Sequence, residues 1–410
     1  MVKEEILKSY AKKYGTPFYL FDYDALSSRV QQIKNLLPKN SRLCYAMKAN
    51  PFLLEALKED TDLLFEVCSP GELSICEAVK VNPDQIVFSG VVKTKQDIER
   101  AYNLGVGTIT LESFLHATFL EQVVKSSAKP HPQGIIVRLT NGSQFGMNED
   151  CVRKSIALLK DLPGIKIQGI HFFTGTQKKM KKVAEEVSFI QEFCTSIQNE
   201  FSIKFERIEY GPGLAFDYFA EDDYSKNFCD LEEFSAMIKD SPFFWVVESG
   251  RYVASSCGTY VSSVMDIKQN AEVPALFIDG GINHVNYYGQ IMGMKKPPIH
   301  LIKADSMPLA DIQKCTQDVS TNNGYTIYGS LCTTADIITK EYPFKAKPDI
   351  GDILAFANIG AYSVTEGIYL FLSHPLPKIL SFKNGNETLL RNSLESWQLN
   401  TRDEGSCRHG

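Results

Sequence analysis

Apolar and polar positions follow one another along this chain in blocks that predict strands and helices in turn. Apolar residues recur at helical spacing in the intervals 71–79, 95–104, 148–159 and 183–197. Between such intervals, eight short apolar runs predict buried strands at 43–48, 63–67, 85–89, 108–112, 134–139, 167–173, 205–210 and 243–247. Strands that are apolar throughout and separated by helices are typical of a parallel sheet covered on its outer face. Eight such units predict a closed (β/α)8 barrel.

The pattern changes after residue 251, where Gly and Pro turns separate short strand-like runs and long helices become rare. The runs lie at 261–267, 275–278, 325–328 and 353–356. An amphipathic helix within 1–14 and an aromatic-rich strand at 16–23 precede the barrel. We expect this N-terminal strand to complete a C-terminal antiparallel β domain. The predicted divisions are an N-terminal helix and strand (1–28), the barrel (29–251), the β domain (252–390) and a flexible tail (391–410).

Composition narrows the class of protein. A net charge of −6 without a basic stripe argues against nucleic acid as the main partner. No apolar run approaches the length of a membrane span, and the first residues predict a helix rather than a signal peptide. The ten cysteines form no CxxC pattern and the seven histidines form no metal-binding motif. We therefore expect a cytoplasmic enzyme with reduced thiols, no metal and no membrane partner.

Ionisable side chains and glycines gather where the predicted strands end. The C-terminal ends of parallel barrel strands form one rim, and active sites are built there. We therefore expect these residues to meet on that rim. They are Lys48, Glu66, Glu112, Arg138, the segment 173–176, Gly211-Pro212-Gly213 and Glu248-Ser249-Gly250-Arg251.

Taken singly, each of these residues also fits a structural role. Lys48 fits an ordinary strand-end lysine, Gly211-Pro212-Gly213 a tight turn, and Arg251 a salt-bridging arginine. Glu248 fits a structural partner as well as a site residue. Together they describe a lysine able to form a Schiff base, a loop whose N–H groups bind phosphate, and a carboxylate that pairs with a pyridinium nitrogen. This combination predicts pyridoxal 5'-phosphate as the cofactor.

Six motifs, in this order and spacing, resemble those of the fold-type III pyridoxal-phosphate-dependent decarboxylases, the group of diaminopimelate, ornithine and arginine decarboxylases. The similarity extends from Thr16 to about Pro377. It implies a barrel plus β domain and a homodimer with shared active sites. The motifs are Tyr45-Ala46-Met47-Lys48-Ala49-Asn50, Phe65-Glu66-Val67-Cys68-Ser69-Pro70-Gly71-Glu72-Leu73, Gln144-Phe145-Gly146-Met147, Glu248-Ser249-Gly250-Arg251, Gly329-Ser330-Leu331-Cys332 and Gly360-Ala361-Tyr362.

The resemblance also implies roles for individual residues. Lys48 is expected to form the Schiff base, and Glu248 to pair with the pyridine nitrogen. Cys332 of the partner subunit is expected to act as a catalytic proton donor. Substrate contacts are expected from Asp336, Thr333 and Tyr288. The remaining cofactor-binding residues are expected to be Glu66, Arg138, Phe173, Thr176, Gly211, Gly213, Gly250, Arg251 and Tyr362.

The chain departs from the family pattern at three places. Phe173 stands where the family usually has a histidine that stacks on the cofactor ring; it can stack but cannot transfer a proton. His171, two residues earlier, fits a core residue as well as a site residue. Thr333 stands where relatives that bind a distal ammonium carry Asp or Glu. The arginine that follows the Asp279–His284 motif in diaminopimelate decarboxylases is missing.

These features favour decarboxylation of an amino acid in a biosynthetic pathway, with a specialised or carrier-protein-bound substrate. Three segments are similar to the branch of the butirosin carrier-protein-glutamate decarboxylase: Thr174-Gly175-Thr176-Gln177, Glu248-Ser249-Gly250-Arg251-Tyr252 and Cys332-Thr333-Thr334-Ala335-Asp336. The short connection from strand five to Gln144 suits an open cleft for a tethered substrate. The alternatives are a pyridoxal-phosphate-dependent racemase or epimerase, and an inactive regulatory homologue. Cys332 argues against the first, and the second is disfavoured by the retention of Lys48, Glu248, Arg251, Cys332 and Asp336.

Overall fold

The computed structural model describes residues 2–128, 130–220, 227–269, 271–304 and 324–402. The chain divides into two compact units. One contains Ser27–Phe216 and Lys226–Val253, and the other contains Met1–Leu26, Asp217–Ser225 and Ala254–Gly410. The sequence-based division placed 217–225 in the barrel. In the structure the Tyr218 hydroxyl lies 2.9 Å from the Ser255 hydroxyl, and the Tyr218 ring packs edge-on against Tyr287. The functional boundaries at 28, 251 and 390 stay predictions.

The first unit is a closed barrel of eight parallel strands, as the sequence pattern predicts. Each strand pairs with its neighbour in sequence, and the first pairs with the last through Ser41 and Trp245. The middle of the strands is buried because both faces of a covered parallel sheet exclude water. The strands are β2 (Ser41–Ala46), β3 (Leu64–Val67), β4 (Ile86–Phe88), β5 (Thr108–Leu111), β6 (Gln133–Arg138), β7 (Ile165–Phe173), β8 (Arg207–Gly211) and β9 (Phe244–Ser249).

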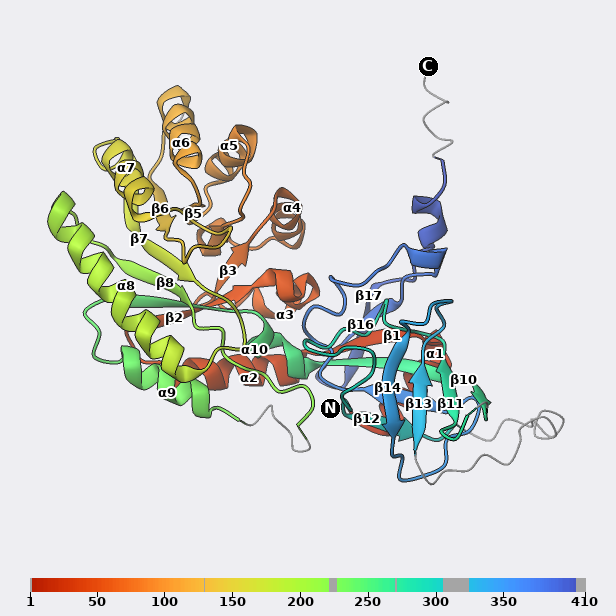
Figure 1. Cartoon of the computed structure of the whole chain (residues 1–410). Helices are drawn as coiled ribbons and strands as arrows, with labels where there is room; N and C mark the ends of the chain where they lie inside the picture. The colour runs from red at the N-terminus through yellow and green to blue at the C-terminus, as the bar shows by residue number, and fades with distance from the viewer. Residues whose placement is uncertain (1, 129, 221–226, 270, 305–323, 403–410) are drawn as a thin grey trace, which may run out of the picture. The chain divides into compact units, whose positions relative to one another are not determined.

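Helices lie around the outside of these strands (Figure 1). Side-chain caps fix where several of them begin: the Ser69, Ser113 and Asn148 side chains each accept a hydrogen bond from the first turn. Thr94 forms a reciprocal capping box with Asp97. The helices are α2 (Tyr23–Leu36), α3 (Leu54–Leu57), α4 (Pro70–Val79), α5 (Lys95–Leu104), α6 (Phe114–Ser126), α7 (Glu149–Leu159), α8 (Met180–Phe201), α9 (Cys229–Ile238) and α10 (Arg251–Ala254).

The second unit is built on a nine-stranded sheet in which β12 and β15 lie off the main path. The prediction of a C-terminal β domain completed by the N-terminal strand is confirmed. The sheet is mixed rather than wholly antiparallel, because β1 pairs with β16, and β11 with β13, in parallel. The strands are β1 (Phe18–Asp22), β10 (Gly258–Lys268), β11 (Ala275–Ile278), β12 (Ile299–Ile302), β13 (Tyr325–Tyr328), β14 (Ile337–Tyr342), β15 (Ile353–Phe356), β16 (Lys378–Lys383) and β17 (Asn386–Arg391).

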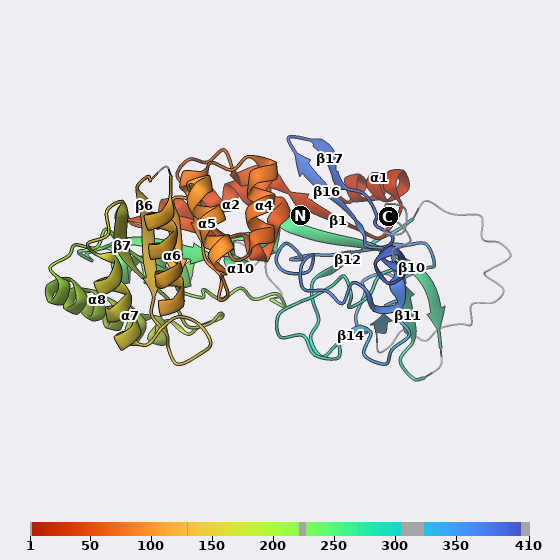
Figure 2. The same cartoon turned by 90° about the horizontal axis from the view of Figure 1, so that it is seen from above.

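The N-terminal helix α1 (Glu4–Tyr14) belongs to the core of this β domain. Its apolar residues Leu7 and Tyr10 are buried together with Phe18 of β1 and Leu380 of β16. Figure 2 shows α1 beside the sheet formed by β1, β16 and β17. Both ends of the chain therefore contribute to one hydrophobic core. Near the C-terminus, the Ser396 hydroxyl donates a hydrogen bond to the carbonyl of His374.

Lys48 lies just past a strand rather than within one. The predicted strand ran to Lys48, but β2 ends at Ala46 and Met47–Ala49 form a turn of 3-10 helix. Asn50 then caps a second turn, Pro51–Leu53, by accepting a hydrogen bond from the N–H of Phe52. The Asn-Pro pair ends the first turn, because a residue before proline is kept out of the α region and Asn50 is extended. The turn sets Lys48 on the C-terminal rim of the barrel.

Candidate active site

The Lys48 amine lies between two buried carboxylates on the barrel rim. Its Nζ donates a hydrogen bond to Glu66 Oε2 at 2.8 Å and lies 3.5 Å from Glu248 Oε1. The Cys68 sulfur is 3.8 Å away. The Lys48 side chain keeps 38% exposure, whereas those of Glu66 and Glu248 keep 2% and 6%. A reactant can therefore reach the amine while the two carboxylates stay dry.

The two carboxylates are in different electrostatic states. Burial and the neighbouring Glu248 charge raise the pKa of Glu66. Burial acts on Glu248 in the same direction, but the charge of Lys48 and a hydrogen bond from Glu66 outweigh it and lower the pKa. Burial alone would lower the pKa of Lys48; Glu66, Cys68 and Glu248 together raise it well above its usual value. Glu248 is thus the carboxylate that stays ionised, as a partner of a pyridinium nitrogen must.

His171 supports Glu248 from the neighbouring part of the barrel. Its Nε2 lies 3.0 Å from Glu248 Oε2, and the residue is fully buried. Burial, and then the charge of Arg138, lower the pKa of His171 to about 3, so the ring is neutral at pH 7. Since ionised Glu248 can only accept a hydrogen bond, Nε2 carries the proton and donates it. His171 is therefore part of the site rather than a neutral filler of the core.

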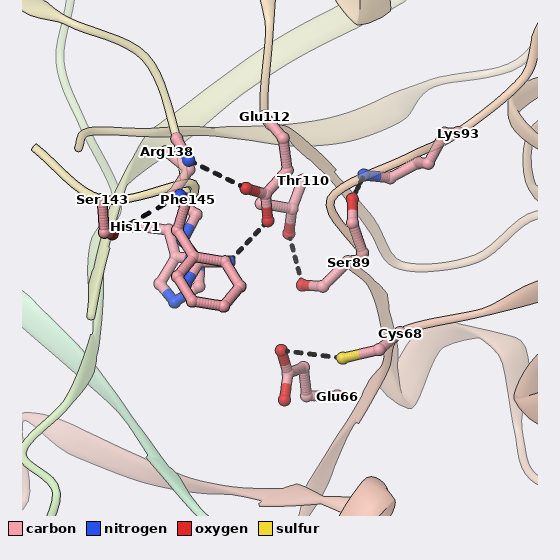
Figure 3. A network of polar contacts seen from close by, with 12 residues as sticks. Glu66, Cys68, Ser89, Lys93, Thr110, Glu112, Arg138, Ser143, Phe145 and His171 are labelled. Atoms are coloured by element: carbon pink, nitrogen blue, oxygen red, sulfur yellow. Dashed lines mark hydrogen bonds and ion pairs between the residues drawn. The ribbon is translucent and has the colours of Figure 1, made fainter. Parts of the chain in front are cut away.

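Arg138 and Glu112 form a buried ion pair on the same rim, from β6 and the end of β5 (Figure 3). Arg138 Nη1 lies 2.5 Å from Glu112 Oε1, and both side chains are almost fully buried. The other Glu112 oxygen accepts a hydrogen bond from the N–H of Gly146 at 3.0 Å. The Phe145 ring stacks on the Arg138 guanidinium at 4.6 Å. The pair therefore holds the short 140–146 connection, which sequence reasoning singled out without predicting the pair itself.

Two glycine-containing loops after β7 and β8 form a narrow cradle. Gly213 has a φ of +60°, and a Cβ there would lie 2.3 Å from the carbonyl oxygen of Gly175 and 3.1 Å from Thr176 Cα. The Phe173 ring occupies the space beside Gly211, where a Cβ would meet it at 2.5 Å. The predicted residues Phe173, Thr176, Gly211 and Gly213 are thus brought together. A concave backbone that excludes side chains is what phosphate binding by N–H groups requires.

A buried lysine that sequence reasoning missed joins these two loops. Lys178 Nζ contacts Glu186 Oε2 at 2.6 Å, the Gly211 carbonyl at 3.0 Å and the Tyr210 hydroxyl at 3.2 Å. Its backbone N–H donates to the carbonyl of Gly213 at 3.0 Å. No motif marks Lys178, because its partners come from α8 and β8 and meet only in the fold. We call Lys178, Glu186 and Tyr210 the loop brace.

Replacing Lys178 with methionine is expected to weaken binding of pyridoxal phosphate by about tenfold or more, the free energy of one charge-assisted hydrogen bond. Binding of phosphate-free pyridoxal is expected to change little, since the brace acts on the loops of the phosphate cradle. Equilibrium titration of the cofactor-free protein with each compound measures both. Lys182→Met is the matched control, because Lys182 is 55% exposed and lies 3.8 Å from the same Glu186. An equal loss for both compounds would show a general structural defect instead.

The remaining predicted residues divide between the two units. Gly250 and Arg251 follow β9 on the barrel, where a Cβ on Gly250 would lie 3.0 Å from Ala49 Cβ. The others lie in the β domain, where Cys332 is exposed, Thr333 and Tyr362 are partly buried and Tyr288 keeps 47% exposure. Asp336 is buried, and its carboxylate accepts hydrogen bonds from the N–H groups of Ile282 and Leu331. The predicted roles of these residues stay predictions.

The fold and the site define a class: a barrel enzyme with a rim lysine, an ionised carboxylate beside it and a cradle suited to a phosphate group. The donor set fits pyridoxal phosphate. The family described as "Pyridoxal-dependent decarboxylase, pyridoxal binding domain" matches residues 23–255, and its "C-terminal sheet domain" matches residues 251–360. The chain belongs to the pyridoxal-dependent decarboxylases. It is an amino-acid decarboxylase with pyridoxal phosphate as its cofactor.

Known relatives match the chain over nearly its whole length. An L-glutamyl-[BtrI acyl-carrier protein] decarboxylase of Niallia circulans is 26% identical, covering 93% of this chain and 92% of the relative. A 2-[(L-alanin-3-ylcarbamoyl)methyl]-2-hydroxybutanedioate decarboxylase of Staphylococcus aureus is also 26% identical, over 90% and 95% of the two chains. The crystal structure of diaminopimelate decarboxylase from Helicobacter pylori superposes with a TM-score of 0.78 at 20% identity, covering 96% and 98%. In the described part of this chain, no helix has the length and hydrophobicity of a membrane span.

Proposed function

We propose that the protein removes the α-carboxylate of an amino acid that is tethered to a carrier protein or otherwise conjugated at its far end. The observation that carries the catalytic part is the Lys48 amine, exposed and held by Glu66 and Glu248 on the barrel rim. Support for the substrate class comes from the relatives. One is named for a carrier-bound glutamyl group, the other for an alaninyl group joined through a carbamoyl link. In neither name does the amino acid carry a free distal ammonium.

Each residue of the site then has a distinct task. Lys48 would hold the cofactor through its aldehyde carbon, and ionised Glu248 would keep the ring nitrogen protonated. Phe173 would pack on the ring, and the N–H groups near Thr176 and Gly213 would bind the phosphate. Bound pyridoxal phosphate supplies an electron-withdrawing ring beside the breaking bond. The racemase alternative is not favoured, because the family is one of decarboxylases.

A screen of CO2 release tests the substrate class. It compares free glutamate, diaminopimelate, ornithine and lysine with glutamate attached to a phosphopantetheinyl carrier protein and with an N-acylated diaminopropionate. We expect CO2 from a conjugated substrate and little from the free amino acids. Turnover of free diaminopimelate at ordinary efficiency would overturn the conjugated-substrate proposal. Racemisation without CO2 release would overturn decarboxylation itself.

We also propose that Cys332 acts across a homodimer, as a proton donor to the substrate carbon in the partner's barrel. Cys332 is exposed on the β domain, so its thiol is available to a neighbouring molecule. The eight cysteines that the structure describes are all free thiols, which supports the proposal of a reducing cytoplasm. Homodimer and compartment otherwise rest on the family resemblance.

Mixing two inactive variants tests the shared site. Cys332→Ala and Lys48→Ala are each expected to be inactive as homodimers. After subunit exchange, heterodimers carry one site with both changes and one site with neither, so about a quarter of the wild-type activity should return for a two-fold dimer. Mixing Lys48→Ala with Glu248→Ala, both barrel residues, is the control and should restore nothing. Failure of the first mixture despite proven exchange would place Cys332 outside the partner's site.

A further inference from the structure

A row of polar side chains continues from Glu248 into the barrel interior. Glu248 on β9 contacts His171 on β7, and His171 is the register partner of Glu209 on β8. Glu209 Oε2 in turn accepts a hydrogen bond at 3.0 Å from Arg207 Nη2, which also donates to Thr108 Oγ1 at 2.9 Å. Both His171 and Glu209 are completely buried. So many polar groups inside a barrel require a reason, because packed barrels are normally filled by aliphatic side chains.

Three buried atoms of this row have no hydrogen-bond partner within the described chain: His171 Nδ1, Glu209 Oε1 and Arg207 Nε. One ligand-type atom each of His171, Glu209 and Glu248 lies within 4.8 Å of the others, so the three groups share one small volume. A buried polar atom without a partner destabilises the folded state, so His171 Nδ1 and Glu209 Oε1 each need a complement. A side-chain rotation that brings a protonated Glu209 Oε1 to Nδ1 would satisfy both.

The charges around the pair agree with that proton. Burial raises the pKa of Glu209 to about 8, although Arg207 opposes it, so the group is mostly a carboxylic acid at pH 7. His171 is neutral because burial and Arg138 lower its pKa. A neutral imidazole with an acceptor at Nδ1 carries its proton on Nε2. The other charged groups facing the pair are Glu66, Glu112, Lys48, Arg138, Arg207 and Glu248.

We propose that His171 and Glu209 are positioning residues for the cofactor: Glu209, as a carboxylic acid, donates to His171 Nδ1 and so holds the Nε2 proton toward Glu248. The opposite tautomer would turn a lone pair toward the Glu248 carboxylate, which would rotate away or take up a proton. Either change would weaken its pairing with the ring nitrogen. The inference rests on the proposed role of Glu248.

Cofactor binding tests the inference without measuring turnover. The probes are pyridoxal phosphate and its analogue with carbon in place of the ring nitrogen, titrated into cofactor-free protein. Glu209→Leu removes the donor and is expected to weaken pyridoxal phosphate binding by about tenfold, with little change for the carbon analogue. Glu209→Gln keeps an N–H donor and is expected to bind both compounds like the wild type. If Glu209→Leu does not fold, the same titrations compare His171→Leu, which removes the hydrogen-bond donor to Glu248, with His171→Gln, which keeps an N–H donor.

Three outcomes separate the possibilities. Loss of binding in Glu209→Gln equal to that in Glu209→Leu would show that the Glu209 charge, paired with Arg207, is what matters, and would overturn the inference. An equal loss for both compounds in Glu209→Leu would reduce the pair to a structural role and would also overturn it. Wild-type protein that prefers neither compound would instead refute the role of Glu248, and with it the proposed function.

The pH dependence of stability gives an independent test. Because the folded pKa of Glu209 is about 8 against an ordinary 4.5, the folded state holds a proton that the unfolded chain releases between these values. The stability of the wild type relative to Glu209→Gln should therefore fall as pH rises from 4.5 to 8. Urea unfolding of both proteins at pH 5 and pH 8.5 measures this. A difference that does not change with pH would mean that Glu209 is ionised throughout, and would contradict the shared proton.

Discussion

Lys48→Ala is expected to abolish decarboxylation, with a loss of about 10³-fold or more, because the variant lacks the amine that we propose bonds to the cofactor. The visible absorption band of the protein-bound cofactor should shift or disappear. The variant also loses the cation that lies within 3.5 Å of both Glu66 and Glu248. The two carboxylates then face each other alone, which should raise the pKa of Glu66 further. Absorbance spectra and CO2 release, measured on the same preparation, check both effects.

Lys48→Arg separates the two losses. Arginine keeps the positive charge between the carboxylates but is not a nucleophile at neutral pH. Lys48→Arg should fold at least as well as Lys48→Ala. It should bind the cofactor but lack the visible absorption band of the wild-type protein, and it should remain inactive. Substantial activity in either variant would remove Lys48 from its proposed role.

Glu112→Gln is expected to lower the free energy of unfolding by about 3–5 kcal/mol, the cost of leaving a buried charge without its partner. The exposed part of the Arg138 side chain is only 6%, so water cannot replace the lost carboxylate. Phe145 still stacks on the guanidinium, but a ring face compensates for a small part of this cost. Denaturant unfolding of the cofactor-free protein measures the change.

The matched control is Glu121→Gln, which breaks the exposed pair between Glu121 and Lys125 on α6. That change should cost no more than about 0.5 kcal/mol. The double variant Glu112→Leu with Arg138→Met should recover most of the stability, because an apolar pair of similar volume removes the buried charges together. It should bind the cofactor poorly, since Arg138 is expected near the ring. A loss in Glu112→Gln as small as in the control would show that the pair is hydrated.

The barrel could be predicted from the sequence because the pattern that marks each strand and helix lies within its own short segment. Most of the eight apolar runs lie next to a helix, and several end in an ionisable residue on the rim, as with Arg138 on β6. Lys95–Leu104 was predicted with the bounds that the structure shows, since Thr94 and Gly105 mark its two ends. The end of β2 was less certain, because an apolar residue such as Met47 fits a strand and a 3-10 turn equally well.

Four of the nine strands described in the second unit, β12, β14, β16 and β17, escaped sequence analysis, two of them for a clear physical reason. β14 and β17 each lie at an end of the main sheet path, so their sequences IITKEY and NETLLR are largely polar and carry no apolar run. Each pairs with the strand just before it in the chain, so its place depends on that partner rather than on an apolar pattern of its own. The same holds for the loop brace and for the Glu209–His171 pair. Lys178 and Glu209 look ordinary in the sequence, and only the closure of the barrel places them beside the site.

The place of β1 in its sheet has a consequence for how the chain is made. β1 lies between β10 and β16, and the Lys378 amine binds the carbonyl of Tyr14 across 364 positions. At ordinary rates of translation, about 20–70 seconds pass between the synthesis of these two segments. During that time the apolar FYLFD segment has no neighbouring strand until β10 is made, and it lacks β16 until the end. Nascent chains should therefore depend on protection of their first 22 residues by chaperones until the C-terminal strands emerge.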